Sequence, residues 1–407
     1  MPTTLSSNKL AIALFTLYLW VLPIAQTIAL RNIFFVALIA LTALEVWRKN
    51  IRIRFPLAAA WALYALAAIS SLFYAKDFLF SLGEIKGEIA NSLLVLMLAA
   101  SWINNLKDLT LFLGLVTMGN ALQIMGVIAK LLWFSPFWTT PDIPLSSLLN
   151  IGAGKIWYNG VGNLSSFLVT TLPLVMAFAF DQARQRNVLT WATLALVALN
   201  FLALYATGNR MGLIAAMVEI GVTAGWLIYH QKRRWLLITG ALLVLLAIMG
   251  GALLKVAQTR TSENDAHWGH DVRWKMWQAT LDYIGQHPVS GEGFGRTVAA
   301  HTNSALQKAL NYEHAHNMVL NKGIQMGLPG IAAFLLLWAA TIYSLRPGKE
   351  DDPRLQVYAV AATAMAAGVF AKNMTDDFFV QHNALLFWLL VGAILGARSK
   401  APLTPMT

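Results

Sequence analysis

The feature that most constrains this chain is a series of long apolar blocks separated by short polar segments. Each block is close to the roughly 20 residues that a helix needs to cross about 30 Å of hydrocarbon. Helices suit this setting because they satisfy their own backbone hydrogen bonds, and the blocks lack the alternating pattern of barrel strands. Only 12% of the residues are charged, against about 25% in soluble domains. The sequence therefore predicts an all-α polytopic membrane protein.

The apolar blocks predict about twelve transmembrane helices. The expected spans are 10–30, 32–47, 55–74, 89–103, 109–133, 165–180, 188–206, 211–229, 235–254, 326–345, 355–373 and 381–397. The first block is interpreted as a retained helix because no convincing small-residue cleavage site follows it. An even number of spans places both termini on the same side of the membrane.

The distribution of basic residues orients these spans. The net charge of +11 would also suit a nucleic-acid-binding protein. However, Lys and Arg concentrate in the short segments on the side of the termini, for example around residues 48–54 and 232–234. Such segments are normally cytoplasmic. We therefore expect a multi-pass protein of the inner (plasma) membrane with both termini in the cytoplasm, membrane lipid around it and no nucleic-acid partner.

Two connections on the predicted outer face are long, at residues 134–164 and 255–325. Connections of more than about 15 residues are uncommon unless they are functional or disordered. The second is rich in Trp and His, which argues against disorder. The predicted organisation is transmembrane helices one to nine in 1–254, a large periplasmic loop with short helices and the catalytic elements in 255–325, and helices ten to twelve in 326–407.

The large loop contains a predicted amphipathic helix in DVRWKMWQATLDYIGQHP. Its apolar side chains share one face at helical spacing: Trp274, Trp277, Leu281 and Ile284. Since Trp favours membrane interfaces, we expect this helix to lie on the bilayer surface. The alternate glycines of the following segment could present backbone N–H groups to an anion: Gly291, Gly293 and Gly295.

Two arginines stand at the predicted outer surface. Arg210 follows the seventh span in TGNRMG, and Arg273 lies at the start of the loop helix. The arginine fork matches phosphate oxygens and stays charged, which suits a lipid pyrophosphate. Arginines near lipid headgroups can also simply extend toward water. The residues alone leave both interpretations open.

His316 occupies a distinctive place in EHAHNMVLNKGIQMG. If this segment is helical, His316 shares a narrow face with Gly323 and Gly327, and His314 points nearly the opposite way. A neutral His at the mouth of such a groove suits a general base. The spacings HWGH and HAH also suggest a metal, but no third ligand is obvious, so we expect none.

Three acidic residues have competing interpretations. Glu219 lies inside the eighth span, where ionisable groups are costly and often functional; packing against a polar neighbour is the preferred interpretation. Asp376 and Asp377 follow the eleventh span. They are interpreted as a solvated cap, with orientation of an arginine or of the base as the alternative.

At this point the chain resembles the O-antigen ligase family of bacterial inner membranes. The resemblance lies in Arg273 within RWKMW, then a Pro, the G-x-G-x-G segment, and His-Asn followed after nine residues by Gly in HNMVLNKGIQMG. It also extends to the span number and the large outer loop. Asn209 stands where the family usually has Ser before its arginine.

The resemblance implies an inverting, membrane-embedded glycosyltransferase of the GT-C type that needs no metal and no cofactor. The donor would be O-antigen polysaccharide on undecaprenyl pyrophosphate, and the acceptor a sugar hydroxyl of lipid A–core, joined on the periplasmic face. The implied catalytic residues are His316, Arg210 and Arg273. Lower-ranked contacts to the pyrophosphate are Arg260, Arg296, Lys372 and His314.

Three other functions remain open. An O-antigen polymerase and a protein O-oligosaccharyltransferase are similar in span count and large loop and differ in acceptor. A transporter of lipid-linked sugars is the alternative outside enzymes, but it predicts polar residues near the bilayer midplane and inverted repeats. The spans are mostly apolar and show no repeat.

Overall fold

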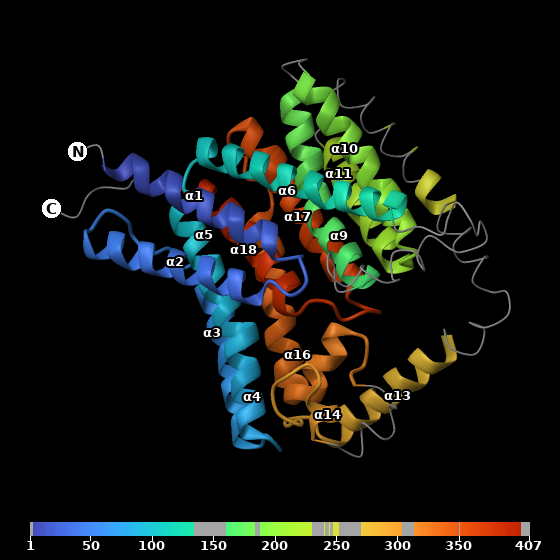
Figure 1. The fold of residues 1–407 in the computed structure, drawn as a ribbon. Helices are drawn as coiled ribbons and strands as arrows, with labels where there is room; N and C mark the ends of the chain where they lie inside the picture. The colour runs from blue at the N-terminus through green and yellow to red at the C-terminus, as the bar shows by residue number, and fades with distance from the viewer. Residues whose placement is uncertain are drawn as a thin grey trace.

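The structure is a computed structural model. It describes residues 3–133, 160–183, 188–229, parts of 240–251, 270–302, 313–349 and 351–399. Throughout these ranges the regular structure is helical, with no strand (Figure 1). The prediction of an all-α fold is confirmed.

Eight stretches in the described ranges are long and apolar enough to cross a membrane. One of them, Phe78–Trp102, joins α4 (Phe78–Glu84), the π-helical turn η2 (Ile85–Ala90) and α5 (Asn91–Trp102). The others are α2 (Ile28–Trp47), α6 (Leu106–Trp133), α9 (Val161–Ala183), α10 (Val188–Ala206), α11 (Arg210–Tyr229), α16 (Met318–Leu345) and α17 (Pro353–Lys372). The chain is a multi-pass membrane protein.

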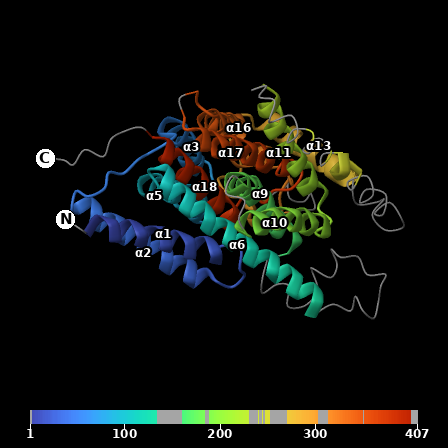
Figure 2. The same ribbon diagram turned by 90° about the horizontal axis from the view of Figure 1, so that it is seen from above.

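Three further helices complete the bundle. They are α1 (Thr3–Val21), α3 (Ala58–Ser70), which η1 (Ser71–Phe73) extends, and α18 (Gln381–Arg398). Eleven of the expected spans therefore coincide with helices, and the ninth, 235–254, lies largely outside the described residues. Seen from above, α9 and α18 lie at the centre, with α1, α2 and α6 on one side and α11, α16 and α17 on the other (Figure 2).

The predicted loop helix exists as α13 (His270–Gln286) and lies beside the start of α16 and α14 (Val298–His301) (Figure 1). The prediction that the apolar face of this helix lies on the bilayer surface is wrong for part of that face. Trp274 and Leu281 are 56% and 54% exposed, but Ile284 is only 4% exposed. Ile284 is covered because α13 packs against α16, where its side chain lies close to Gly323. Part of the apolar face of α13 therefore contacts α16 and is not available to lipid.

In the glycine-rich segment after α13, two backbone N–H groups that the sequence suggested for an anion donate to α16 instead. The N–H of Glu292 donates to the carbonyl of Ile324 at 2.8 Å, and that of Gly293 to Gln325 at 3.3 Å. A Cβ at Gly291 would meet the backbone of α16. The glycines therefore allow the loop backbone to lie directly on α16 and satisfy the carbonyls near its kink at Gly327.

Candidate active site

The N-terminus of α16 sets the position of the His-Asn motif. Asn317 is the N-cap, and its side-chain oxygen accepts the N–H groups of Val319 and Leu320 at 2.9 and 3.0 Å. Its amide donates to the carbonyl of Met374 at 2.8 Å. The same side chain thus starts the helix and ties it to the segment between α17 and α18.

His316 precedes the helix rather than belonging to it, so the predicted helical face that it shares with Gly323 and Gly327 is wrong. Its φ is +49°, in the left-handed region, which is uncommon for residues other than Gly. The Asn317 cap ends any helical continuation toward His316. Such backbone strain concentrates at functional sites, and here it turns the imidazole toward the segment after α17.

His314 and His316 lie together, contrary to the expectation that they point apart. Their ring centroids are 4.1 Å apart, which the non-helical backbone between them permits. The Nδ1 atom of His314 accepts the backbone N–H of His316 at 3.1 Å, and Nη2 of Arg296 lies 2.6 Å from its Nε2. His314 is 7% exposed, whereas the side chain of His316 is 28% exposed.

The pKa of His314 gives a stability prediction. Burial, with the charges of Arg296 and His316, lowers this pKa from 6.5 to about 3. The unfolded chain therefore takes up a proton that the folded chain refuses, and stability falls as the pH drops below 6.5 toward 3. We expect the melting temperature of His314→Gln to fall less between pH 7 and pH 4 than that of the wild type, measured by calorimetry. A parallel fall in both proteins would contradict this.

Asp376 connects the segments that carry the predicted catalytic residues. Its Oδ1 lies 3.8 Å from Nδ1 of His316, and its Oδ2 accepts the side-chain amide of Asn209 at 3.3 Å. Burial alone would raise its pKa, but His316, the charges of Lys372 and Arg273, and Asn209 together hold the pKa below its usual value. Asp376 is thus a carboxylate facing His316, and its interpretation as a solvated cap is wrong.

Asp377 is the second acid of this segment and is more deeply buried than Asp376, with a 5% exposed side chain. It lies 3.6 Å from Nε of Arg296 and accepts the side-chain amide of Asn321. Asn321 in turn accepts the N–H of Ala315 at 2.8 Å. Burial raises the pKa of Asp377. Arg296, predicted as a pyrophosphate contact, is 24% exposed and lies between His314 and Asp377.

The two predicted phosphate-binding arginines are exposed and lie on helices tied to this network. Arg210 is the first residue of α11; its neighbour Asn209 accepts the N–H of Gly212 at 2.8 Å and donates to Asp376. Arg273 lies in the first turn of α13, close enough for its charge to lower the pKa of Asp376. One turn later, the indole of Trp277 donates to the carbonyl of Ala315 at 2.9 Å.

Two lower-ranked candidates are placed differently. The side chain of Lys372 is buried, with Nζ 4.7 Å from the ring centre of Phe378. Its charge acts on Asp376 and Asp377, but the side chain is buried in the protein and does not lie at the surface. Arg260 lies outside the described residues.

The Asn317 contacts lead to a prediction that separates two roles. Asn317→Ala removes both the cap and the tie to Met374, whereas Asn317→Asp keeps a capping oxygen and loses only the donated amide. Loss of a cap typically costs about 1 kcal/mol, so we expect Asn317→Ala to have the lower melting temperature. Equal melting temperatures in a thermal-shift assay of the two variants would show that the cap contributes nothing.

Sequence reasoning missed Asn209 and Asn321 as hydrogen-bond partners in the site, and it preferred a solvated cap for Asp376 and Asp377 over the alternative that they orient an arginine or the base. One signal was available: two adjacent acids directly after an otherwise apolar span are costly unless they have partners. The partners themselves come from α11, α13 and α16, and no local pattern indicates which segments meet.

Comparison with known families gives one match. The family model described as O-antigen ligase matches residues 194–335. The match confirms the resemblance seen in the sequence motifs. It supports a relation between this chain and the wider group of O-antigen ligases and polymerases, whose members are glycosyltransferase-like enzymes. It includes Arg210, Arg273 and His316 but ends before Asp376. No curated protein matches the chain significantly.

Proposed function

We propose, from its match to the O-antigen ligase family, that this protein transfers O-antigen polysaccharide from undecaprenyl pyrophosphate to a sugar hydroxyl of lipid A–core. We place the reaction on the periplasmic face of the bacterial inner membrane, with both termini cytoplasmic. The observation that supports this most is the convergence on Asp376 of His316, Asn209 at the start of α11, and the charge of Arg273. Three segments far apart in sequence thus meet at Asp376, which supports the proposal that His316, Arg273 and Arg210 act at one site.

In the proposed reaction, His316 is the general base. Asp376 faces Nδ1 of the imidazole, which leaves Nε2 for the acceptor hydroxyl. As Nε2 takes the hydroxyl proton, the oxygen attacks the anomeric carbon from the side opposite the pyrophosphate. The bond from that carbon to the pyrophosphate oxygen breaks, and the configuration inverts. Asp376 is a positioning residue that orients the ring.

Arg210 and Arg273 hold the leaving pyrophosphate in this proposal. Their guanidinium groups are exposed and can therefore reach a ligand at the surface of the bundle. Preorganised donors stabilise charge that grows in the transition state, and an arginine fork pairs with two phosphate oxygens at once. Two fixed positive charges can thus serve the role that a divalent metal serves elsewhere.

A reconstituted transfer reaction tests the proposal. Purified full-length protein is incubated with undecaprenyl-pyrophosphate glycan and purified lipid A–core, with EDTA present, and the products are separated by electrophoresis. We expect glycan to appear on lipid A–core at an unchanged rate in EDTA. A transporter would give no transfer, a polymerase would lengthen the carrier-linked glycan, and an oligosaccharyltransferase would require a protein acceptor. Each of those outcomes would contradict the ligase.

Gene deletion provides an independent test in cells. Loss of a ligase should leave polymerised glycan on the carrier lipid and bare lipid A–core at the surface. Loss of a polymerase should instead leave single repeat units attached to lipid A–core.

A further inference from the structure

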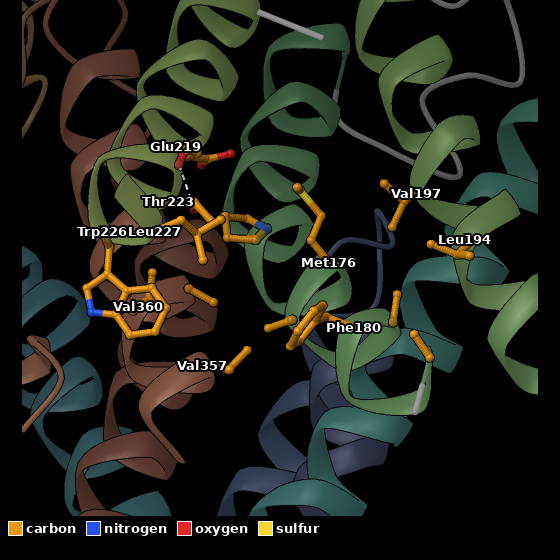
Figure 3. A pocket seen from close by; sticks show the side chains of 15 residues that line it. Met176, Phe180, Leu194, Val197, Glu219, Thr223, Trp226, Leu227, Val357 and Val360 are labelled. Atoms are coloured by element: carbon orange, nitrogen blue, oxygen red, sulfur yellow. Dashed lines mark hydrogen bonds between the residues drawn. The ribbon is translucent and has the colours of Figure 1, made fainter. Parts of the chain in front are cut away.

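An apolar cavity of about 400 Å³ lies among α9, α10, α11 and α17 (Figure 3). Its wall includes Glu219, whose carboxyl oxygens are buried without a hydrogen-bond partner in the described part of the chain. Thr223 donates to the backbone carbonyl of Glu219 at 2.9 Å (Figure 3), and a Cβ at Gly368 would overlap the carboxyl group. The expected packing of Glu219 against a polar neighbour is therefore wrong, and the carboxyl group gives the cavity no charge with which to select a ligand. The polar contacts next to His316 are different, because they hold the backbone of the candidate active site.

Trp277 holds the peptide group that leads into His316. It lies on α13, about one helical turn after Arg273, and its indole N–H donates to the carbonyl of Ala315 at 2.9 Å. That carbonyl and the N–H of His316 belong to one planar peptide unit. The N–H in turn donates to Nδ1 of His314 at 3.1 Å. Side chains therefore hold this peptide plane at both of its polar atoms.

The preceding peptide group is held from α16. The N–H of Ala315 donates to Oδ1 of Asn321 at 2.8 Å, and the side-chain amide of Asn321 donates to Asp377. Ala315 is fully buried, so water cannot easily replace the indole N–H at its carbonyl. A buried acceptor that loses its donor is costly. Loss of the bond from Trp277 should therefore let the peptide rotate toward another donor.

The backbone of His316 depends on this restraint. Its φ of +49° lies in the left-handed region, which costs energy and persists only where the surroundings hold it. The angle φ joins the restrained peptide plane to the Cα atom that carries the imidazole. On the other side of that atom, Asn317 is fixed as the N-cap of α16. The direction of the imidazole, with Nδ1 at 3.8 Å from Asp376, is thus set between the bond from Trp277 and the cap.

We propose that Trp277 is a positioning residue: its indole N–H orients the peptide before His316 so that the imidazole faces Asp376 and the acceptor hydroxyl. The inference rests on the proposed role of His316 as general base. Because Arg273 lies one turn earlier on the same helix, α13 carries both a contact to the leaving pyrophosphate and the restraint on the base. The spacing within RWKMW thus links the two groups that act on opposite sides of the anomeric carbon.

Simple packing is the alternative role for this indole. However, other side chains dock α13 onto α16. Met276 is 3% exposed and belongs to the same buried cluster as Ile324 of α16, and Ile284 is 4% exposed. Trp277 is only half-buried. The two roles can therefore be separated by removing the indole N–H while keeping the ring.

Replacement of Trp277 by benzothienylalanine, whose sulfur takes the place of the indole N–H, tests the proposal. We expect kcat of the purified full-length protein to fall by about 10–10²-fold, because small misplacements of a reacting group are costly. The KM values for donor and acceptor and the melting temperature should stay close to those of the wild type. Trp277→Phe should reduce kcat at least as much. The same replacement at Trp274, which is 56% exposed on the same helix, should leave kcat unchanged.

The imidazole of His316 gives a readout that does not depend on transfer. Its NMR signal, in protein isotope-labelled at histidine Cε1 and assigned with His316→Gln, should shift when Trp277 is replaced by benzothienylalanine and stay in place in the Trp274 control. An unshifted signal, or a kcat equal to that of the wild type, would overturn the proposal and assign the indole to packing. Absence of transfer by the wild type together with a shifted signal would contradict the proposed reaction and still confirm the restraint of His316 by Trp277.

Discussion

His316→Ala is expected to reduce the rate of glycan transfer by about 10²–10⁴-fold, the usual contribution of a general base. The side chain is 28% exposed and precedes the Asn317 cap, so its removal should leave the start of α16 and the insertion of the protein intact. The measurement is single-turnover transfer to lipid A–core by purified protein. The melting temperature should stay close to that of the wild type.

A matched control for this variant is His287→Ala. His287 directly follows α13; it is exposed and stacks on Tyr283 with ring centroids 4.5 Å apart. It should transfer glycan at the wild-type rate. If His316→Ala also retains that rate, His316 is not the base.

Asp376→Asn should give a smaller loss and a shifted pH–rate profile, because the ring remains but its carboxylate partner does not.

More of the fold than of the site could be predicted from the sequence. The apolar blocks indicate helices because length and hydropathy are local properties, and eleven expected spans coincide with helices in the described ranges. The G-x-G-x-G segment shows where this reasoning ends. Its glycines were interpreted as an anion-binding loop, but the N–H groups of Glu292 and Gly293 donate to the carbonyls of Ile324 and Gln325. Only the approach of α16 decides between these two uses of the same pattern.

The error at His316 has a similar cause. Periodicity treated EHAHNMVLNKGIQMG as one helix, whereas Asn317 caps α16 and leaves both histidines outside it. An Asn directly before an apolar run is a recognisable helix start, so this boundary could have been predicted. The contact of His316 with Asp376 could not, because the two residues are brought together by the packing of α16 against α17.

Arg210→Ala and Arg273→Ala are each expected to lower the transfer rate by about 10²–10³-fold, the loss typical for one preorganised charge donor. Substitution by Lys should restore only part of the rate at either position, because an ammonium group cannot form the two parallel bonds of the guanidinium fork. The interpretation as simple headgroup contacts makes the opposite prediction, since any cation at the surface would then suffice. The comparison of Ala with Lys variants by single-turnover kinetics distinguishes the two.

Lys275 provides the control for surface charge in this experiment. It is an exposed cation two residues after Arg273 on the same helix, so Lys275→Ala removes an equal charge from α13. We expect near-normal transfer by this variant. An equal loss in Lys275→Ala and Arg273→Ala would mean that α13 acts through its overall charge, for instance by attracting anionic lipid. A normal rate in Arg210→Ala would place the pyrophosphate away from α11, and the convergence of α11, α13 and α16 on Asp376 would then be structural.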